Sequence, residues 1–428
     1  MNSKSPPHFA IIGAGTAGLA TAILLARQNI QVSILEKASE LEPVGAGLLL
    51  QPSGLAVFEH LGLLDEVLRL GAKVTGLKGQ LPSGNLLVNS HYQQAHPDFY
   101  GVGIHRATLC HVLENKCRKY SELITWQMNT DIQKLKETSN QVRVSGTKDG
   151  ESFDQAFDAV IIANGARSLL RPKEWGKVDQ AYPWGAKWTI VPECLELDTE
   201  ILHQFHDRSK MMMGILPTGT VPHEPKQRLS SVFWSLPSHQ LNSFLHNSQA
   251  HSDWLNQVSK RWKPAADWLE QVIAQPEQKS QWLTANYRDV VLSKFGEGRI
   301  GVMGDAAHAM SPQLGQGANM ALLDAWALGQ AVQSARKNEN IDYVQLWQTY
   351  HQHRQSSTAF YQFLSRLLTP LYQSDLWWAG GLRDFSFAWM YRIPYFRKEM
   401  AVTISGFKLG MFSQMNYRDI AKQNNHSV

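Results

Sequence analysis

The sequence lacks several features that would place it outside the class of ordinary globular proteins. It has only three cysteines, Cys110, Cys117 and Cys194, with no Cys-x-x-Cys spacing, so neither a disulfide framework nor a zinc site is expected. It has no run of 18 uncharged apolar residues, so no membrane-spanning segment is expected. The start, MNSKSPPHFAIIGAG, lacks the apolar region and cleavage site of a signal peptide, which predicts a cytoplasmic protein.

The sequence also lacks a large excess of charge of either sign. The 428 residues include 41 Lys and Arg against 37 Asp and Glu, and the basic residues form no long run, so nucleic-acid binding is not expected. No metal site is expected either, because Met211–Met213 lacks accompanying Cys or His residues at ligand spacing. With 43% hydrophobic residues and 14 Trp, 12 Tyr and 16 Phe, the chain is expected to form a large core.

The N-terminal segment predicts a βαβ unit, with strands at His8–Ile12 and Gln31–Glu36 and a helix at Thr16–Gln28. The motif GAGTAG occupies its first turn, where glycines permit a tight turn, a close approach to a pyrophosphate and close helix–strand packing. Glu36 lies 21 residues past Gly15, at the end of the second strand, where its carboxylate can accept the hydroxyls of an adenosine ribose. This pattern predicts an adenine dinucleotide; the alternative is a glycine-rich turn used only for packing.

A second glycine-rich stretch, RIGVMGDAAHAMSPQLGQGANMALLDA, covers residues 299–325. Gly304 would let the chain turn so that Asp305 meets a sugar-alcohol hydroxyl, and Gly315–Gly317 would offer bare N–H groups at the start of a helix. A helix N-terminus favours the anion of a reduced flavin. The alternative is a strand–turn–helix with a structural aspartate.

The fold class expected is α/β, with a Rossmann-like cofactor domain, an inserted and mostly antiparallel β-sheet domain, and a helical C-terminal region. The apolar runs Ala156–Ala163 and Arg299–Met303 are expected to complete the first sheet, while WGAKWTIV, MMMGILPTG and LSSVFWSLP are expected strands of the insert. The expected divisions are 1–179 (first part of the cofactor domain), 180–290 (insert, substrate domain), 291–370 (completion of the cofactor domain and a long helix) and 371–428 (aromatic-rich helical region).

Three stretches, GAGTAGLATAILLARQNIQVSILEK, VIIANGARSLLRP and RIGVMGDAAHAMSPQLGQGANMALLDA, resemble in order and spacing the fingerprints of single-component FAD-dependent aromatic hydroxylases, the p-hydroxybenzoate hydroxylase-like flavoprotein monooxygenases. The resemblance covers about residues 8–335. It implies non-covalent FAD, reduction by NADPH or NADH, and oxygen transfer to an aromatic ring from a C4a-hydroperoxyflavin. GIHRATLCHVL resembles the segment that brings an arginine, here Arg106, to the FAD; the alternative is a surface arginine on a helix.

The resemblance also implies residue roles. Pro312 is similar to the proline beside the reactive face of the flavin, and with Gly315 it is expected at the catalytic position. The usual Asp-Gly of the middle fingerprint is Asn164-Gly165 here, which puts the handling of NAD(P)H by Arg167 and its neighbours in question. His308 is expected to be a packing or hydrogen-bonding residue rather than an acid–base catalyst. The expected cofactor-binding residues are Gly13, Gly15, Ala17, Gly18, Glu36, Lys37, Arg106, Asn164, Gly165, Asp305, Gly315, Gly317, Ala318 and Asn319.

The expected function is the hydroxylation of a neutral or multi-ring aromatic substrate with NAD(P)H and O₂, because the insert offers apolar residues and few cations. The alternatives are a non-catalytic flavoprotein that shelters an intermediate, and a hydroxylase of lipid-like quinone precursors at a membrane surface. A halogenase is disfavoured by the lack of a Trp-x-Trp-x-Ile-Pro stretch, and an NAD dehydrogenase by the missing second βαβ half. The aromatics of Asp375–Phe412 are expected to pack on the core; weak peripheral membrane contact is the other option.

Overall fold

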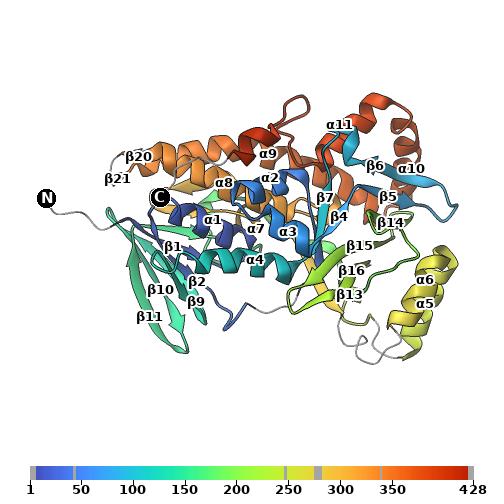
Figure 1. The fold of residues 1–428 in the computed structure, drawn as a ribbon, viewed down its shortest axis with the longest axis horizontal. Helices are drawn as coiled ribbons and strands as arrows, with labels where there is room; N and C mark the ends of the chain where they lie inside the picture. The colour runs from blue at the N-terminus through green and yellow to red at the C-terminus, as the bar shows by residue number, and fades with distance from the viewer. Residues whose placement is uncertain (1–5, 42–44, 245–247, 274–281, 338–339, 423–428) are drawn as a thin grey trace.

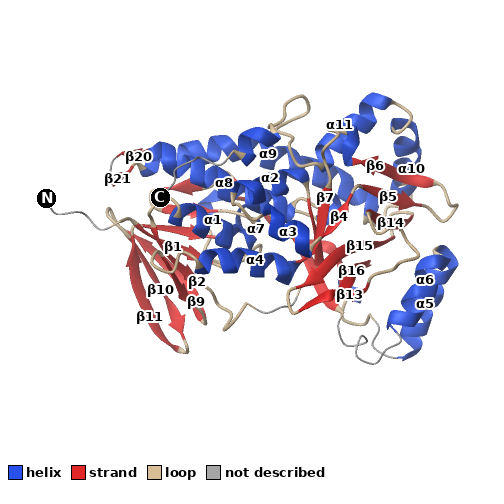
Figure 2. Cartoon of the chain, viewed as in Figure 1, coloured by secondary structure: helices blue, strands red, loops and turns tan. Residues whose placement is uncertain are grey.

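A computed structural model of the chain describes residues 6–41, 45–244, 248–273, 282–337 and 340–422. Two large sheets organise these residues, one in the left half of the view and one in the right half, with a long band of helices above them (Figure 1, Figure 2). The α/β architecture with a parallel sheet, an antiparallel sheet and C-terminal helices confirms the fold class expected from the sequence.

The first sheet is mostly parallel and has the strand order β18-β19-β12-β1-β2-β8. Its strands are β1 (His8–Ile12), β2 (Gln31–Leu35), β8 (Ile124–Gln127), β12 (Ala159–Ile162), β18 (Gly296–Glu297) and β19 (Ile300–Val302). The two apolar runs predicted to complete the sheet supply β12 and β19, which pair in parallel with each other, while β12 also pairs with β1. The sheet thus brings the ends of β1 and β19 to the same edge with only β12 between them, although the two strands lie far apart in the sequence.

Alternate residues of β1 face two different layers, as the period of a strand requires. Phe9 and Ile11 pack into the helical layer, whereas Ala10 and Ile12 pack against a small antiparallel sheet. This small sheet consists of β9 (Thr130–Glu137), β10 (Val142–Lys148) and β11 (Glu151–Phe157). The main helices of the other layer are α1 (Thr16–Ala26), α4 (Arg106–Arg118), α8 (Gly317–Ala335) and α9 (Tyr343–Tyr372). Burial on both faces explains why β1 reads as a continuous apolar run.

The second sheet has the order β17-β13-β16-β15-β14-β5-β6. Its strands are β5 (Gly76–Gln80), β6 (Leu86–His91), β13 (Gly176–Pro192), β14 (Ile201–Asp207), β15 (Met211–Val221), β16 (Glu224–Pro237) and β17 (Leu283–Leu292). The three strands predicted within the insert are found in β13, β15 and β16. However, β5 and β6, which lie within residues 1–179, also belong to this sheet, because β5 pairs in parallel with β14. This non-local pairing leaves no signal in the local sequence.

Two helices, α5 (Ser248–Arg261) and α6 (Lys263–Ile273), cover one face of this sheet. Trp254, Trp262 and Trp268 pack there against Met213 and Trp234. Every residue of β15 is buried, so the three consecutive methionines of this strand are core residues. Among the described residues no group of three or more His, Cys, Asp or Glu is arranged to hold a metal ion.

The remaining elements are short or lie near the C-terminus. A small sheet of β3 (Gly47–Leu50), β7 (Gly101–His105) and β4 (Ala72–Val74) packs against β15. The other helices are α2 (Pro52–His60), α3 (Leu64–Leu70), α7 (Asp305–His308), α10 (Ala379–Met390), α11 (Pro394–Ile404) and α12 (Tyr417–Ala421), with a 3₁₀ turn at Pro312–Leu314. None of the helices in the described ranges combines the length and the apolar character that a membrane crossing requires.

The C-terminal aromatics differ from the expectation that they pack on the core. Phe387 is buried, but Trp377 and Phe385 are 87% and 75% exposed, and Trp378, Trp389 and Tyr395 are exposed as well. The reason lies in the orientation of α10, which presents Ala379, Arg383 and Phe387 to the protein and its other apolar side chains to solvent. The expectation of core packing was therefore wrong for most of these residues.

Beneath α10 lies a histidine with an unusual environment. His206 in β14 is fully buried, its ring packs on Tyr372, and neither ring nitrogen has a hydrogen-bond partner among the described residues. Burial, reinforced by the charge of the neighbouring Arg383, holds the pKa of His206 well below its usual value. The imidazole is consequently neutral in the folded protein, while in the unfolded chain it binds a proton below about pH 6.5.

This difference predicts a loss of stability in mild acid. The depressed folded-state pKa of His206 contributes full stability above about pH 6.5, and the contribution falls by up to about 1.4 kcal/mol per pH unit as the pH decreases. Between about pH 7.5 and 5.5 the free energy of unfolding should decrease in both the wild type and the His206→Leu variant. We expect the decrease to be about 1 kcal/mol smaller in His206→Leu than in the wild type, as measured by urea titration. His239→Leu, at an exposed position, is the control and should keep the wild-type slope. Equal slopes in all three proteins would contradict the assignment.

Candidate functional site

The turn after β1 has the geometry that a phosphate-binding loop requires. Gly13 has a φ of +106°, and a Cβ added there would lie 2.6 Å from the Ala163 carbonyl oxygen. A Cβ added at Gly18 would lie 2.0 Å from the Gly13 carbonyl oxygen, so glycine is needed for α1 to pack this closely. By contrast, a Cβ added at Gly15 would meet no described atom within 4 Å, and α1 begins there without a side-chain cap. The first amides of α1 are thus accessible to an anionic ligand.

Glu36 lies directly after β2 and faces the same turn. Its Oε2 accepts a hydrogen bond of 2.7 Å from the Ala14 amide, and its Oε1 accepts one of 2.9 Å from the Ala38 amide. These bonds orient the carboxylate but leave acceptor capacity, since two carboxylate oxygens offer about four lone-pair sites. Lys37 points elsewhere, into an exposed ion pair with Asp131 at 3.0 Å.

Gly304 brings the second loop against the first. Its φ is +59°, and a Cβ added there would lie 3.0 Å from the Cβ of Ala17 in α1. Asp305 follows at the start of α7, and its Oδ1 would lie 3.8 Å from a Cβ added at Gly317, in the first turn of α8. The exposed Asp305 carboxylate makes no hydrogen bond or ion pair with the described residues. A fixed carboxylate without a protein partner is suited to accept a ligand hydroxyl.

The loop between α7 and α8 ends in a left-handed residue, Gly315, with a φ of +60°. Its amide donates a hydrogen bond of 2.9 Å to the Pro312 carbonyl, which closes the 3₁₀ turn. A Cβ added at Gly315 would lie 3.5 Å from Nε2 of Gln51. The helix α8 then begins at Gly317 and Ala318 without a side-chain cap, so a second helix N-terminus with accessible amides faces this loop.

Asn319 holds this loop in place from beneath. The side chain is fully buried, and its Nδ2 donates to the carbonyls of Leu49 and Gly315, both at 3.1 Å. Its Oδ1 accepts a hydrogen bond of 2.8 Å from the Gln51 amide. Because these protein groups occupy the amide, Asn319 positions the loop, and a direct bond to a cofactor would compete with these contacts.

The other predicted residues lie around the first turn. Arg106 begins α4 and is exposed, and a Cβ added at the neighbouring Gly45 would lie 2.8 Å from the Arg106 Cβ. Asn164 follows β12, is exposed, and its Cα would lie 2.8 Å from a Cβ added at Gly13. Gly165 has a φ of +86° and open space around its Cβ position. The Asn164-Gly165 turn therefore borders the first glycine loop.

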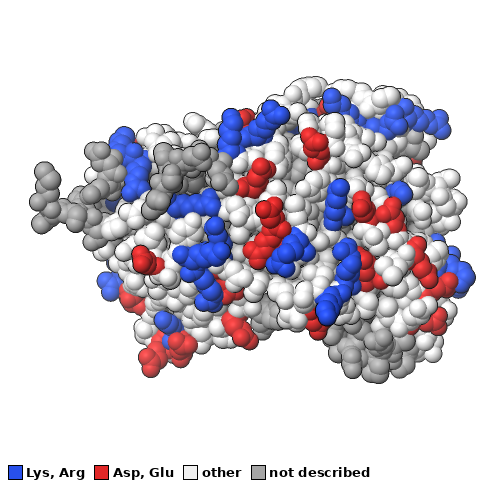
Figure 3. Space-filling view, viewed as in Figure 1, with Lys and Arg blue, Asp and Glu red and all other residues white. Residues whose placement is uncertain are grey.

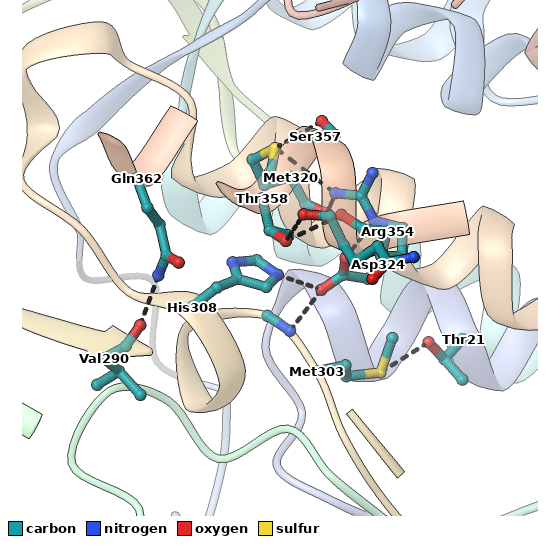
Figure 4. A network of polar contacts seen from close by, with 12 residues as sticks. Thr21, Val290, Met303, His308, Met320, Asp324, Arg354, Ser357, Thr358 and Gln362 are labelled. Carbon is teal, nitrogen blue, oxygen red and sulfur yellow. Dashed lines mark hydrogen bonds and ion pairs between the residues drawn. The ribbon is translucent and has the colours of Figure 1, made fainter. Parts of the chain in front are cut away.

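A buried ionic network, missed by the sequence analysis, supports the second loop (Figure 4). Asp324 of α8 is completely buried, and its Oδ2 accepts hydrogen bonds of 2.7 Å from the Gly304 amide and 2.6 Å from Nε2 of His308. Its Oδ1 accepts a hydrogen bond of 2.6 Å from Nε of Arg354 in α9. One carboxylate therefore joins the turn after β19, the helix α7 and the long helix α9.

The charge state of this network follows from its contacts. Burial by itself raises the pKa of Asp324, but the charges of His308 and Arg354 and their hydrogen bonds outweigh this effect and lower the pKa to about 2. The carboxylate is thus ionised and accepts only, so Nε2 of His308 carries the proton of the shared hydrogen bond. His308 is 3% exposed, which agrees with the predicted hydrogen-bonding role.

Together these loops fit a long dinucleotide with a flavin at one end. The site has two uncapped helix N-termini, Glu36 at the end of β2, and Asp305, which has no partner among the described residues. These are groups of the kinds that bind a pyrophosphate, a ribose and a sugar alcohol. The contact between Gly304 and Ala17 makes the two halves one continuous site. The donor set therefore fits FAD, and no observation in the described residues conflicts with it.

Comparison with known proteins agrees with this geometry. A family model described as an FAD binding domain matches residues 8–360, which is most of the chain. The chain belongs to this FAD-binding monooxygenase family. It is an FAD-dependent monooxygenase of the aromatic hydroxylase type, as the resemblance of its three fingerprints implied.

Two relatives illustrate the range of this hydroxylase family. The chain is 28% identical over 339 residues to 3-hydroxybenzoate 6-hydroxylase from Klebsiella oxytoca, covering 75% of this chain and 79% of the relative. It is 25% identical over 386 residues to 2-heptyl-3-hydroxy-4(1H)-quinolone synthase from Pseudomonas aeruginosa, covering 87% and 92%. Their names refer to different aromatic rings, so the comparison establishes the class of reaction and leaves the substrate open.

Solved structures show the same fold. PqsL from P. aeruginosa, in complex with 2-aminobenzoylacetate, superposes with a TM-score of 0.73 at 21% identity, over 89% of this chain and 99% of PqsL. The p-nitrophenol 4-monooxygenase PnpA from Pseudomonas putida gives a TM-score of 0.74 at 16% identity, over 95% and 100%. The hydroxylase therefore shares its architecture along nearly the whole chain.

The buried network of the hydroxylase predicts a strong effect of a small substitution. Asp324→Asn removes the charge that compensates Arg354 and replaces one of the two acceptor oxygens with an NH2 group, which can only donate. We expect it to cost about 3–5 kcal/mol in the free energy of unfolding. The contribution of the Asp324 charge should be present above about pH 4 and lost as the pH falls toward 2, because the folded-state pKa is lowered. Urea unfolding with and without FAD measures both the stability and the FAD affinity.

Asp179 provides the matched control, since it also binds two arginines, Arg171 and Arg288, but is 43% exposed. We expect Asp179→Asn to cost less than about 1 kcal/mol. If Asp324→Asn were no more damaging than this control, the network would not be the support of the second loop.

Proposed function

We propose that this hydroxylase acts on a neutral or weakly polar, multi-ring aromatic compound, such as a phenol, indole, quinolone or quinone precursor, with electrons from NADH or NADPH. The observation that carries this proposal is the state of the arginines near the second loop. A small benzoate would require an arginine whose guanidinium is free to bind its carboxylate.

Arginines that contact the second loop or the long helix α9 already have acidic partners. Arg171 donates to the Ala306 carbonyl of α7 at 3.4 Å and binds Asp179 at 2.8 Å. Arg354 binds Asp324 at 2.6 Å and Arg383 binds Asp384 at 2.7 Å. Arg366, beside the α9 residues that contact Ser311, binds Asp289 at 2.6 Å. A carboxylate substrate would have to displace one of these acidic partners, of which Asp324 and Asp289 are buried, and the displaced charge would lose its compensation. This cost favours a neutral substrate.

The groups around Pro312 are neutral hydrogen-bonding side chains. The Ser311 hydroxyl lies 2.8 Å from the hydroxyl of Ser365 and 2.5 Å from that of Thr369, and Gln313 donates to Gln373 at 2.8 Å. On the other side of Gly315, the hydroxyl of the buried Tyr92 donates to Gln51. Such groups suit the phenol, amide or ketone of a neutral ring system.

The residue roles that we propose follow from the site. Glu36 binds the adenosine ribose, Arg106 the phosphates and Asp305 the ribityl chain, and the backbone of Gly315–Asn319, with the accessible amides at the start of α8, faces the pyrimidine edge of the flavin. FAD, when bound, supplies the transfer of electrons from the nicotinamide and the activation of O₂. The chain itself orients the flavin, and the N-terminus of α8 stabilises negative charge at its edge.

Two further roles are proposed for residues around the flavin. Pro312 and Gly315 place the backbone next to the reacting ring, and their turn defines how closely the substrate can approach. Asn164 keeps the hydrogen-bonding shape of an aspartate beside the first loop without its charge, so we propose that it tunes the step in which NADH or NADPH reduces the flavin.

The relatives support two substrate classes. The quinolone synthase is named for a bicyclic ring with an apolar chain, and 3-hydroxybenzoate 6-hydroxylase for a small acid. The pairing of the arginines favours the first class. A flavoprotein that shelters an intermediate without turning over is the second candidate function, because it would keep every FAD-binding feature.

The proposed role of Asp305 predicts a loss of cofactor affinity. Asp305→Ala leaves a ribityl hydroxyl without its acceptor and should cost about 1–3 kcal/mol of FAD binding, a loss of roughly 5- to 150-fold in affinity. Asp65→Ala is the control, since Asp65 is also an exposed aspartate in the first turn of a short helix. Fluorescence titration of the apoprotein measures both. Unchanged affinity in Asp305→Ala would contradict the assignment of the second loop.

The proposed substrate class is tested with the FAD-loaded wild type. Phenols, indoles, quinolones and benzoates are compared for stimulation of NADH and NADPH oxidation and for hydroxylated product, with peroxide release as the measure of uncoupling. We expect tight coupling with a larger neutral ring. Tight coupling with a small benzoate and none with neutral rings would overturn the substrate class. Tight binding of an aromatic without any coupled product would favour the sheltering flavoprotein.

A further inference from the structure

The outward surface of the C-terminal helices carries an unusual amount of exposed apolar surface. Of the sixteen large hydrophobic side chains that are exposed among the described residues, eleven fall within residues 363–412, so the exposure is concentrated in one region. We call this region the C-terminal apolar face. Its members are Phe363, Leu367, Leu376, Trp377, Trp378, Leu382, Phe385, Trp389, Tyr395, Met411 and Phe412.

The helix α10 forms the centre of this face. Trp378, at its N-terminal boundary, and Leu382, Phe385 and Trp389 follow one another at spacings of four, three and four residues, which places them on one stripe of the helix. All four are 45–75% exposed, while the opposite side of α10 packs on the protein. A helix at the surface of a protein normally has polar side chains on the side that faces the solvent. The apolar stripe on the outer side of α10 therefore indicates that this side meets an apolar or interfacial environment.

The charge at the edge of the face is positive. Arg392, Arg397 and Lys398 make no ion pair with other described residues. The acidic groups nearby are neutralised, because Asp384 binds Arg383 at 2.7 Å and Glu399 binds Lys408. Figure 3 shows basic side chains along the upper right edge of the molecule, over α10 and α11. The excess positive charge favours an anionic partner.

We propose that the C-terminal apolar face rests on the surface of a lipid bilayer that contains anionic headgroups. Tryptophan and tyrosine side chains bind the boundary between headgroups and acyl chains, and the flanking Arg and Lys bind lipid phosphates. A two-fold dimer through the same face would bring the basic residues of both copies together, which the charge disfavours. Surface hollows of about 340 and 170 Å³ flank α11, the larger lined by Lys398 and Phe412 and the smaller by Arg397.

The face is connected to the second cofactor loop. After α11 the chain returns inward, where Nε2 of Gln316, the residue before α8, donates a hydrogen bond of 2.7 Å to the Ile404 carbonyl. The Ser53 amide donates one of 3.0 Å to the Ser405 carbonyl. Docking through α10 and α11 would therefore bring the membrane surface against α11, a helix whose C-terminal end contacts the second cofactor loop directly.

The test is flotation of the FAD-loaded, full-length protein with vesicles of phosphatidylcholine alone and of phosphatidylcholine with phosphatidylglycerol. We expect binding to the anionic vesicles that weakens with salt. Trp377→Ser with Trp389→Ser should weaken it at least tenfold, and each of Arg392→Ala and Lys398→Ala about fivefold. Leu195→Ser and Lys226→Ala, at exposed positions outside the face, are the matched controls and should bind as the wild type does.

Vesicle binding requires no turnover, so the proposal stands or falls independently of the substrate class. It is overturned if neither vesicle binds the protein, or if the tryptophan and arginine variants bind as tightly as the controls. Sedimentation of the protein without lipid tests the alternative occupant of the face, a second copy of the chain. A concentration-dependent dimer that disappears in the double tryptophan variant would assign the face to a second copy of the chain instead.

Discussion

The carboxylate of Asp324 is the group on which the architecture of the site depends. It is a fully buried, ionised group, and it is stabilised by three donors from two parts of the chain: Gly304 and His308 in the segment after β19, and Arg354 on α9. Losing any one donor leaves a buried charge incompletely compensated, which is strongly unfavourable. The end of the parallel sheet, the short helix α7 and the long helix α9 are consequently held in one arrangement, and Asp305 inherits its position from it.

How much of this could be read from the sequence depended on the range of the contacts. The first loop was predictable because its glycines and Glu36 belong to one βαβ unit, in which local spacing determines the geometry. The role of Asp324 was not predictable in this way: the residue stands in the last fingerprint, but its partner Arg354 is 30 positions away on another helix. An aspartate within an otherwise apolar helix was the available signal, since buried charges occur with partners.

The second sheet and the C-terminal region show the same limit. The strands predicted within the insert were found. However, β5 and β6 from the N-terminal third also belong to this sheet, and the pairing of β5 with β14 leaves no trace in the local sequence of either strand. The tail was misjudged for a different reason. Aromatic content predicts burial on average, but the orientation of a helix decides which aromatics are buried, and α10 turns Arg383 inward and Phe385 outward.

These contacts make the loop at Gly315 the meeting point of three parts of the chain. Asn319 ties it to β3 and α2 from below, Ser311 ties its start to α9, and Gln316 ties its end to the turn after α11. A loop held at three points has little freedom to adjust, so its position is set by the rigid elements around it. In the proposed arrangement, the same elements position the flavin edge and the substrate. The C-terminal helices contact this part of the site directly, because the Gln316 side-chain amide donates to the Ile404 carbonyl, the Ser53 amide to the Ser405 carbonyl and the Tyr361 hydroxyl to the Thr403 carbonyl. The outer surface and the second loop are therefore parts of one packed unit rather than separate regions.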